Sequence, residues 1–372
     1  DSVTVLPTNN FYISFNKAKA AEKGIYPKEL VDNEEGRVEF SINIPNEYKY
    51  EQLIRNELML LDILGTNCFE RPIYVMNPRY LTKVFPDIAR YVRQEGLVYR
   101  IMPYVADGTF EYNKTNDLFL NKFQWGGVKD EGVYLEEAVS INNSKNMRNN
   151  FSLFAGKLIH NGAKQDAIKI LDKALVEFPS SKIPFDRYDI MLAEAYFNAG
   201  EIQKGQAVLN ELISYYVSYV KYLEQFKGKK AKAVEGEKTL SIYVLAEMAT
   251  LAEKYNLKAE LDLAISNPLV AEIMETYKVR DLMNEYAMKL NQVNAIINSD
   301  KAGAEELLLG VIEGLNTNIL ATGNNTLIEQ SAQYFGFIYS TAYRFSLAKV
   351  QKALSDNPKI QEILNNLMAS QQ

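Results

Sequence analysis

The sequence contains very little of three residue types on which many active sites depend. Its 372 residues include one cysteine, one histidine and one tryptophan, which are Cys68, His160 and Trp125. A single cysteine excludes an internal disulfide and a zinc site built from cysteines. A single histidine excludes every metal site that needs two histidine ligands. We therefore expect no metal site and no cofactor.

Long apolar runs and a surplus of charge of one sign are also missing. No stretch has the roughly 18 uninterrupted apolar residues that cross a bilayer, and no signal-peptide pattern opens the chain. The 41 basic and 47 acidic residues give a net charge of -6, which leaves no basic surface for a phosphate backbone. We expect no nucleic-acid partner. Because the chain begins with Asp1, we expect a processed product or a segment of a longer protein.

Catalytic motifs are absent from the sequence as well. It has no GxSxG, no GxGxxG and no Walker A pattern. His160 stands two residues before Gly162, at the expected end of a helix, which favours a surface or turn-packing role. Glu34-Glu35 and Glu136-Glu137 are neighbours in sequence, so neither pair faces one sugar as a glycoside hydrolase requires. We assign no catalytic residue, and a sugar-active hydrolase is the least favoured function.

Residues 1–145 mix strand and helix patterns with frequent glycine and proline. Phe11–Phe15 and the segment Val38–Ile44 alternate as half-buried strands do, and Pro45 stops the second one. The apolar residues of segment 50–65 recur at helical spacing, with Gly65 in the place of a left-handed cap. Two apolar runs predict buried strands, at residues 72–76 and 97–105. This pattern indicates a mixed α/β domain.

Residues 146–215 resemble two tetratricopeptide-like helical hairpins. The first fits the repeat template between Phe151 and Pro179, with its turn at Gly162, and the second has its turn at Gly200. The two turn glycines are 38 positions apart, whereas the template period is about 34 residues, and the extra length falls between Pro179 and Pro184. One hairpin leaves an apolar face uncovered, so the helices that follow must cover this array.

Residues 216–372 are expected to form a further helical region packed on the array. The lysine-rich stretch 227–238 also contains Glu235 and Glu237, which favours a solvated loop over a basic patch. Helices are then predicted at residues 239–255, 258–264, 268–294, 301–316, 325–355 and 358–368. The chain as a whole is therefore predicted to be α+β, with a mixed α/β domain before an all-α tetratricopeptide-like array.

Four aromatic residues are candidates for binding a partner. Phe154, Tyr188 and Tyr196 are expected near the concave face of the hairpins, where a peptide or protein would lie. Trp125 has aromatic neighbours and could stack on a sugar or a peptide, although burial in a domain core is the commoner place for a lone tryptophan. Cys68 is expected to be a small buried residue, because no base or positive charge near it favours a thiolate.

Four strings in the N-terminal part resemble one known family. They are the segment 56–64 (NELMLLDIL), Asn67 with 70–74 (ERPIY), 95–100 (EGLVYR) and 132–135 (GVYL). Their order is similar to the soluble C-terminal region of bacterial glycosyltransferase-like membrane proteins related to protein O-mannosyltransferases of the plexin-modifying type. Where that family commonly has Asn and Trp after Asn67, this chain has Cys68 and Phe69.

The resemblance spans about residues 10–215 and implies a non-catalytic role. In such a family the catalytic residues and the lipid-linked donor site belong to a membrane domain that precedes the soluble part. The soluble part would lie on the periplasmic side of the inner membrane and bind a protein acceptor, or a glycan. A free-standing tetratricopeptide-type interaction module is the alternative, and it predicts a signal peptide directly before Asp1.

Overall fold

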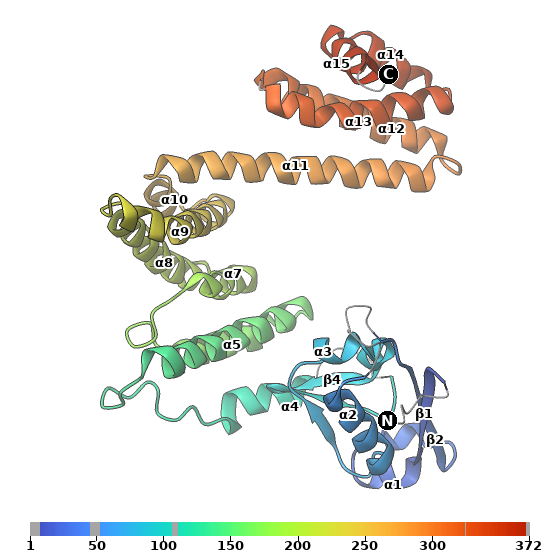
Figure 1. The fold of residues 1–372 in the computed structure, drawn as a ribbon, viewed down its shortest axis with the longest axis vertical. Helices are drawn as coiled ribbons and strands as arrows, with labels where there is room; N and C mark the ends of the chain where they lie inside the picture. Colours follow the sequence, from blue (N-terminus) through green and yellow to red (C-terminus); the bar gives the residue numbers. More distant parts are fainter. Residues whose placement is uncertain (1–7, 45–52, 106–110, 324, 370–372) are drawn as a thin grey trace. The chain divides into compact units, whose positions relative to one another are not determined.

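The computed structural model describes residues 8–44, 53–105, 111–323 and 325–369, and Figure 1 shows its helices and strands. The chain forms two compact units, Asp1–Leu212 and Ile213–Gln372. A small N-terminal sheet region is followed by a helical array, which confirms the α+β class. The finer division into three domains, at residues 145 and 215, stays a prediction.

The first sheet consists of two antiparallel strands near the N-terminus. Strand β1 (Asn10–Asn16) pairs with β2 (Glu35–Ser41) so that Ile13 lies opposite Val38. The alternation of apolar and polar residues places four apolar side chains on the buried face: Ile13, Phe15, Val38 and Phe40. The predicted first strand is confirmed. The second begins and ends three residues earlier than predicted, and Pro45 lies outside the described residues.

Helix α2 (Arg55–Asn67) runs two residues beyond the cap that the sequence predicts. Gly65 lies inside the helix, and the left-handed residue that ends it is Cys68, with φ 46°. Phe69 follows with φ 58°, and its ring is buried against Phe15 at 5.5 Å between centroids. The helix therefore ends where the core needs Phe69, and Gly65 is not the cap. Residues 50–52 of the predicted helix lie outside the described residues.

The second sheet has three antiparallel strands in the order β3-β5-β4. Their bounds are β3 Ile73–Val75, β4 Val92–Glu95 and β5 Val98–Ile101. The prediction of a buried strand at residues 72–76 is wrong in part, because Tyr74 is 43% exposed and Met76 is 84% exposed. As an edge strand, β3 packs Ile73 and the partly buried Val75 against the core on one face and turns Tyr74 toward solvent.

The rest of the first unit is helical, as the hairpin pattern predicts. Helix α5 packs along α6 and α7, and the small residues Ala155, Ala167 and Ala174 are fully buried. Membership in the tetratricopeptide class stays a prediction. The helices of this unit not yet given are α1 Lys17–Glu22, α3 Arg79–Thr82, α4 Tyr112–Asp117, α5 Asn142–His160, α6 Lys164–Glu177, α7 Ile190–Ala199 and α8 Ile202–Leu223, which ends in the second unit.

Arg148 explains why the two hairpin turns are 38 residues apart. Its side chain is fully buried in α5 and forms a bidentate ion pair with Asp189, with Nε–Oδ1 2.7 Å and Nη2–Oδ2 2.6 Å. Its remaining donors bond the carbonyl oxygens of three residues in the segment between α6 and α7, which are Phe178, Ile183 and Pro184. The extra residues of this segment wrap around the guanidinium group and satisfy all five of its donors.

The same helix-ending turn occurs five times among the described residues. A left-handed residue follows the helix, and the next N–H bonds the carbonyl five positions back. This turn is centred on Gly24, Gly162, Gly200, Asn256 and Ser346. Ser346 breaks the predicted helix 325–355 into two, because Leu347 is buried and its N–H bonds the Ala342 oxygen. A template that looks for glycine misses the turns at Asn256 and Ser346.

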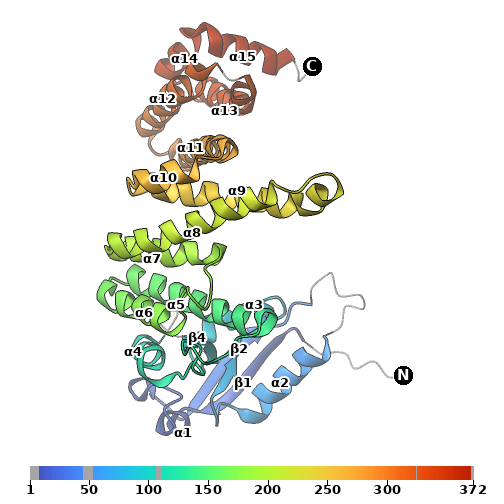
Figure 2. The ribbon, with the colours of Figure 1, turned by 90° about the vertical axis from the view of Figure 1, so that its left-hand side faces the viewer.

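The second unit is all helical, and its order along the chain can be followed in Figure 2. The lysine-rich stretch 227–238 is not a loop, since α9 begins at Lys229 and Gly228 supplies the left-handed residue before it. No helix among the described residues is both long and apolar enough to cross a membrane. The helices are α9 Lys229–Lys254, α10 Lys258–Ala264, α11 Pro268–Ile296, α12 Lys301–Asn318, α13 Asn325–Arg344, α14 Ala348–Ser355 and α15 Pro358–Ala369.

Replacing Arg148 by Leu is expected to destabilise the first unit strongly. The change leaves Asp189 buried without its cation, which typically costs about 3–5 kcal/mol of unfolding free energy. Trp125 is the only tryptophan and its ring lies 5.4 Å from that of Phe178, so its fluorescence during urea unfolding reports on this unit. The control, Lys204→Met, removes a half-exposed pair with Asp172 and is expected to cost less than about 1 kcal/mol. Equal losses in the two variants would contradict the role given to Arg148.

Replacing Ser346 by Gly is expected to stabilise the second unit. Ser346 has φ 52°, a conformation that glycine adopts without steric cost, so the gain is about 0.5–1 kcal/mol. The same substitution at the exposed Ser340, inside α13, should instead lower stability by a similar amount, because glycine weakens a helix interior. Urea unfolding followed by circular dichroism measures both. A loss of stability in Ser346→Gly would show that this turn needs the serine side chain.

Candidate functional site

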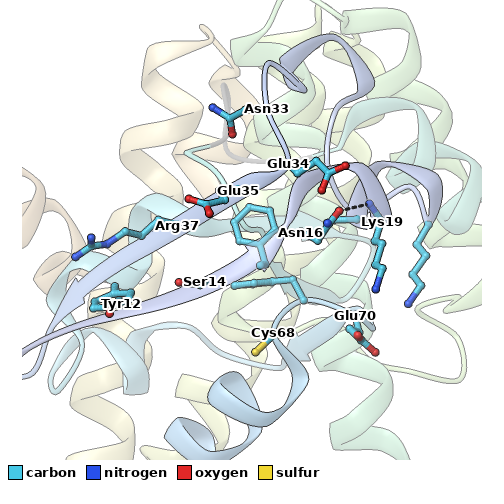
Figure 3. Close-up of a pocket in the computed structure, with 15 residues that line it drawn as sticks. Tyr12, Ser14, Asn16, Lys19, Asn33, Glu34, Glu35, Arg37, Cys68 and Glu70 are labelled. Atoms are coloured by element: carbon cyan, nitrogen blue, oxygen red, sulfur yellow. Dashed lines mark hydrogen bonds between the residues drawn. The ribbon is translucent and has the colours of Figure 1, made fainter.

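A groove of about 1040 Å³ lies beside strand β1 in the first unit (Figure 3). Three segments line it: β1 with the start of α1, the turn that leads into β2, and the residues that follow α2. Figure 3 shows Cys68 and Glu70 on one side and Glu34 and Glu35 on the other. The polar residues of the lining are Tyr12, Ser14, Asn16, Lys19, Lys23, Asn33, Glu34, Glu35, Arg37, Cys68 and Glu70.

Two aromatic rings and one glycine shape the base of the groove. Phe15 and Phe69 are both buried and meet edge to face. A Cβ atom at Gly36 would lie 2.3 Å from the Phe15 ring, so only glycine allows that ring to cross the paired strand. Phe69 is held in the left-handed region, which costs of order 1–3 kcal/mol and persists only where packing compensates for it. This packing fixes Cys68 and Glu70 at the groove.

The backbone of β1 is unpaired along the side that faces away from β2. Lys17 N–H bonds Glu34 O, and Ile42 N–H bonds Asn9 O, which fixes the alternation of the antiparallel ladder. By this alternation, the N–H and C=O groups of Tyr12, Ser14 and Asn16 point away from β2. Among the described residues the N–H groups of all three and the C=O groups of Tyr12 and Ser14 have no partner, whereas the Asn16 C=O begins helix α1 as its N-cap. The outer edge of β2 is different, because Ser41 N–H bonds Asp87 Oδ2 at 3.1 Å.

The exposed face of the first sheet carries a short row of interacting side chains. The guanidinium carbon of Arg37 lies 3.8 Å from the centre of the Tyr12 ring. Its Nε also forms an ion pair with Glu39 at 2.8 Å. Tyr12 is 59% exposed, so its ring presents an amphipathic surface that is already ordered by Arg37.

The charges around the groove are mixed. At one end Lys17 and Asp32 form an ion pair of 2.5 Å, and this hydrogen bond raises the pKa of Lys17 and lowers that of Asp32. The Cys68 thiol donates a hydrogen bond to the Gly65 oxygen at 2.9 Å, at the end of α2. Cys68 is half-exposed, whereas the sequence predicts a buried position. Amides, hydroxyls and both charge signs suit a polar chain that forms hydrogen bonds.

A second polar cluster centres on Glu95 at the end of β4. Burial raises the pKa of Glu95, but hydrogen bonds from Lys114 and Tyr74 and the charge of Arg100 outweigh it and lower the pKa overall. A cavity of about 550 Å³ beside this cluster is lined by Arg93 and Arg100, and each arginine is paired with a glutamate. Because its charges are already neutralised internally, this cluster fits a structural role better than a binding site.

The structure brings two of the four predicted binding residues into one aromatic cluster. Phe154 is 1% exposed and stacks on Phe119 at 5.1 Å. Trp125 is half-buried and also contacts Phe119, with Phe151 and Phe178 around it. Both side chains join the segment after α4 to helices α5 and α6, so packing is their visible role. Binding by either residue stays a prediction.

The other two predicted binding residues differ in their exposure to solvent. Tyr196 is fully buried and donates to Asp172 at 2.9 Å, so a partner on the surface does not reach it. Tyr188 is 48% exposed and its ring lies under Arg187 at 4.8 Å. His160 is exposed at the end of α5, and no group of three or more His, Cys, Asp and Glu among the described residues is placed to hold a metal ion.

The residues of the groove were not found by sequence reasoning. The alternation of segment 11–15 identified a strand, but it did not indicate which of its edges would stay unpaired. That outcome depends on Asp87, which lies 46 positions from Ser41 and covers only the β2 edge. Gly36 was the one local signal, since a glycine inside a strand often marks a close approach of another group.

The comparison with protein families addresses this part of the chain. Residues 1–118 match the family model of TMEM260-associated domain 2. TMEM260 is a protein O-mannosyltransferase-like membrane protein. No curated protein and no solved structure matches the chain. The predicted resemblance is therefore supported in its coarser part, as an accessory domain of a TMEM260-like membrane protein, and over the residues that contain the whole groove.

Two glycine substitutions test the local structure around the groove. Gly36→Ala places a methyl group against the Phe15 ring and is expected to cost about 1–3 kcal/mol of unfolding free energy. Gly65→Ala is expected to stabilise by about 0.5–1 kcal/mol, because Gly65 is an exposed position inside α2 with open space around it. Chemical unfolding followed by Trp125 fluorescence measures both. A loss of stability in Gly65→Ala would contradict the position of Gly65 inside α2 and would support Gly65 as the left-handed cap of the helix.

Proposed function

We propose that the first unit is a non-catalytic, acceptor-binding part of a membrane glycosyltransferase-like protein. In this proposal the groove beside β1 receives an extended segment of a protein acceptor on the periplasmic side of the membrane. The observation that carries it is the match of residues 1–118 to TMEM260-associated domain 2, because the groove and both of its strands lie within these residues. Glycosyl transfer itself belongs to the membrane part of the parent protein.

The unpaired edge of β1 favours a peptide over a glycan as the occupant. Tyr12, Ser14 and Asn16 offer three N–H donors, and Tyr12 and Ser14 offer two C=O acceptors, in the spacing of a strand. An extended peptide added as a third strand pairs with these groups, and its alternate side chains reach the groove. A glycan has no backbone with that repeat. In a peptide bound as a strand, alternate side chains also point away from the groove. The serine and threonine hydroxyls of the acceptor would therefore stay accessible to a transferase.

The helical hairpins provide a second surface for the same acceptor. If they belong to the tetratricopeptide class, the exposed Tyr188 would contact acceptor residues beyond the strand. Phe154 and Tyr196 would support that surface from the core. The groove selects an extended segment, and the hairpins would add specificity through side chains.

A proline scan of the sheet edges tests the proposed function. Ser14→Pro removes an N–H that points away from β2, so the β1–β2 ladder keeps its hydrogen bonds while strand addition is blocked. Glu39→Pro is the matched control, because its N–H points to the other edge of the same sheet. The variants are introduced into the parent protein in its own cells. O-linked hexose on serine and threonine of cellular glycopeptides is then measured by mass spectrometry.

We expect Ser14→Pro to lower the level of O-linked hexose on these glycopeptides on the order of tenfold, since acceptor binding is lost and the chemical step is not touched. Glu39→Pro should retain normal glycopeptide levels. Circular dichroism of the purified segment confirms that both variants fold. Normal glycosylation with folded Ser14→Pro would exclude the groove as the acceptor site. Normal glycosylation after removal of the whole segment would exclude the function itself.

A free-standing protein-interaction module is the second candidate function. It is favoured by the fact that the family match ends at residue 118 and leaves the helical array unmatched. This candidate predicts a signal peptide directly before Asp1 and no hydrophobic spans upstream of it, whereas the first predicts a multi-span domain there. The gene sequence upstream of residue 1 decides between them.

A further inference from the structure

The second unit carries a basic and aromatic surface at one end of a helical hairpin. We name residues 215–238 the hairpin tip; it contains the C-terminal part of α8, the connection to α9 and the first turns of α9. Figure 2 shows this end of α9 on the opposite side from α10. Between residues 221 and 238 there are six lysines and three glutamates, a net charge of +3, although the whole chain carries -6.

Four lysines of the hairpin tip are free of partners. Lys227, Lys229, Lys230 and Lys232 are all exposed. None of them forms an ion pair or a side-chain hydrogen bond with any residue that the structure describes, whereas many lysines elsewhere are paired. Unpaired exposed lysines keep their full charge for an external partner. Helix α9 begins directly after Gly228, so its first turn holds three of them, Lys229, Lys230 and Lys232.

An aromatic ladder runs along α8 beside these lysines. Tyr215, Tyr219, Tyr222 and Phe226 follow at helical spacing, and each ring contacts the next. Tyr215 is 47% exposed and Tyr222 is 53% exposed. The Tyr219 hydroxyl donates to Glu237 of α9, which ties the ladder to the second helix. The ladder is therefore ordered before any partner arrives, and the rings of Tyr215 and Tyr222 stay open to solvent.

Tyrosine rings and lysines side by side fit the surface of a bilayer. The rings are amphipathic and sit at the level of lipid headgroups, while the lysine stems lie along apolar surface and their ammonium groups reach the phosphates. Negatively charged lipids attract each lysine further. A soluble polyanion without rings to stack, such as polyphosphate, would bind through the lysines alone and would not use the exposed tyrosines. We propose that the hairpin tip binds the surface of a membrane that contains anionic lipids.

Vesicle sedimentation with the full 372-residue chain tests this proposal. The probes are vesicles of phosphatidylcholine alone and vesicles that also contain phosphatidylglycerol. We expect binding only to the anionic vesicles, with a loss at high salt. The variant Lys229→Gln/Lys230→Gln/Lys232→Gln should bind on the order of 100-fold more weakly, since each lysine at such a surface contributes roughly fivefold. Lys301→Gln/Lys349→Gln/Lys352→Gln removes the same charge elsewhere in the unit and should bind as the unaltered chain does.

The aromatic part is tested by Tyr222→Ala, with Tyr343→Ala as the control at equal exposure (54%) on α13. We expect Tyr222→Ala to weaken vesicle binding several-fold and Tyr343→Ala to leave it unchanged. Circular dichroism confirms the fold of each variant. Absence of binding to anionic vesicles at low salt would overturn the proposal. So would tight binding to a soluble acidic polysaccharide that depends on the lysines but not on Tyr222. Neither result bears on the groove of the first unit.

Discussion

The buried ion pair of Arg148 and Asp189 sets the geometry of the helical part of the first unit. A guanidinium group has five donors in one plane, and here every donor has an acceptor within the segment that joins α6 to α7. Burial raises the pKa of Asp189, and Arg148 opposes this effect. The pair is worth little as a source of stability, because the two charges lose their hydration. Its effect is conformational: it fixes one path for the connecting chain and therefore one position for α7 along α5.

The sequence predicted the helices of the second unit well and their turns poorly. Amphipathic spacing is a local property, so the positions of α10, α11, α12 and α15 followed from it. A left-handed turn is also local, but sequence reasoning looks for glycine there. Asn256 and Ser346 occupy two such turns, and burial of the following leucine is what selects the conformation. Because that burial depends on neighbouring helices, the break at Ser346 was not visible in the sequence.

The prediction of a loop at residues 227–238 was wrong, and the groove was not predicted at all, for opposite reasons. In the first case a solvated composition was taken for a loop, yet lysine, alanine and glutamate are good helix formers and α9 begins within the stretch. In the second case the strands were correct, but the open edge of β1 results from contacts far away in sequence. Asp87 covers one edge of the sheet and no described residue covers the other. A groove that forms beside an uncovered strand edge has no signature of its own in the sequence.

The open edge of β1 also has a consequence for the behaviour of the protein at high concentration. A strand that can receive a foreign peptide can also pair with the same strand of a second copy, and proteins usually guard such edges with charge or with short length. Here the edge ends at α1, where Lys19 and Lys23 are exposed. Two copies placed edge to edge in the antiparallel sense bring these lysines toward the partner strand. An extended peptide paired with this edge would protect the protein against aggregation, because the edge could then no longer pair with a second copy.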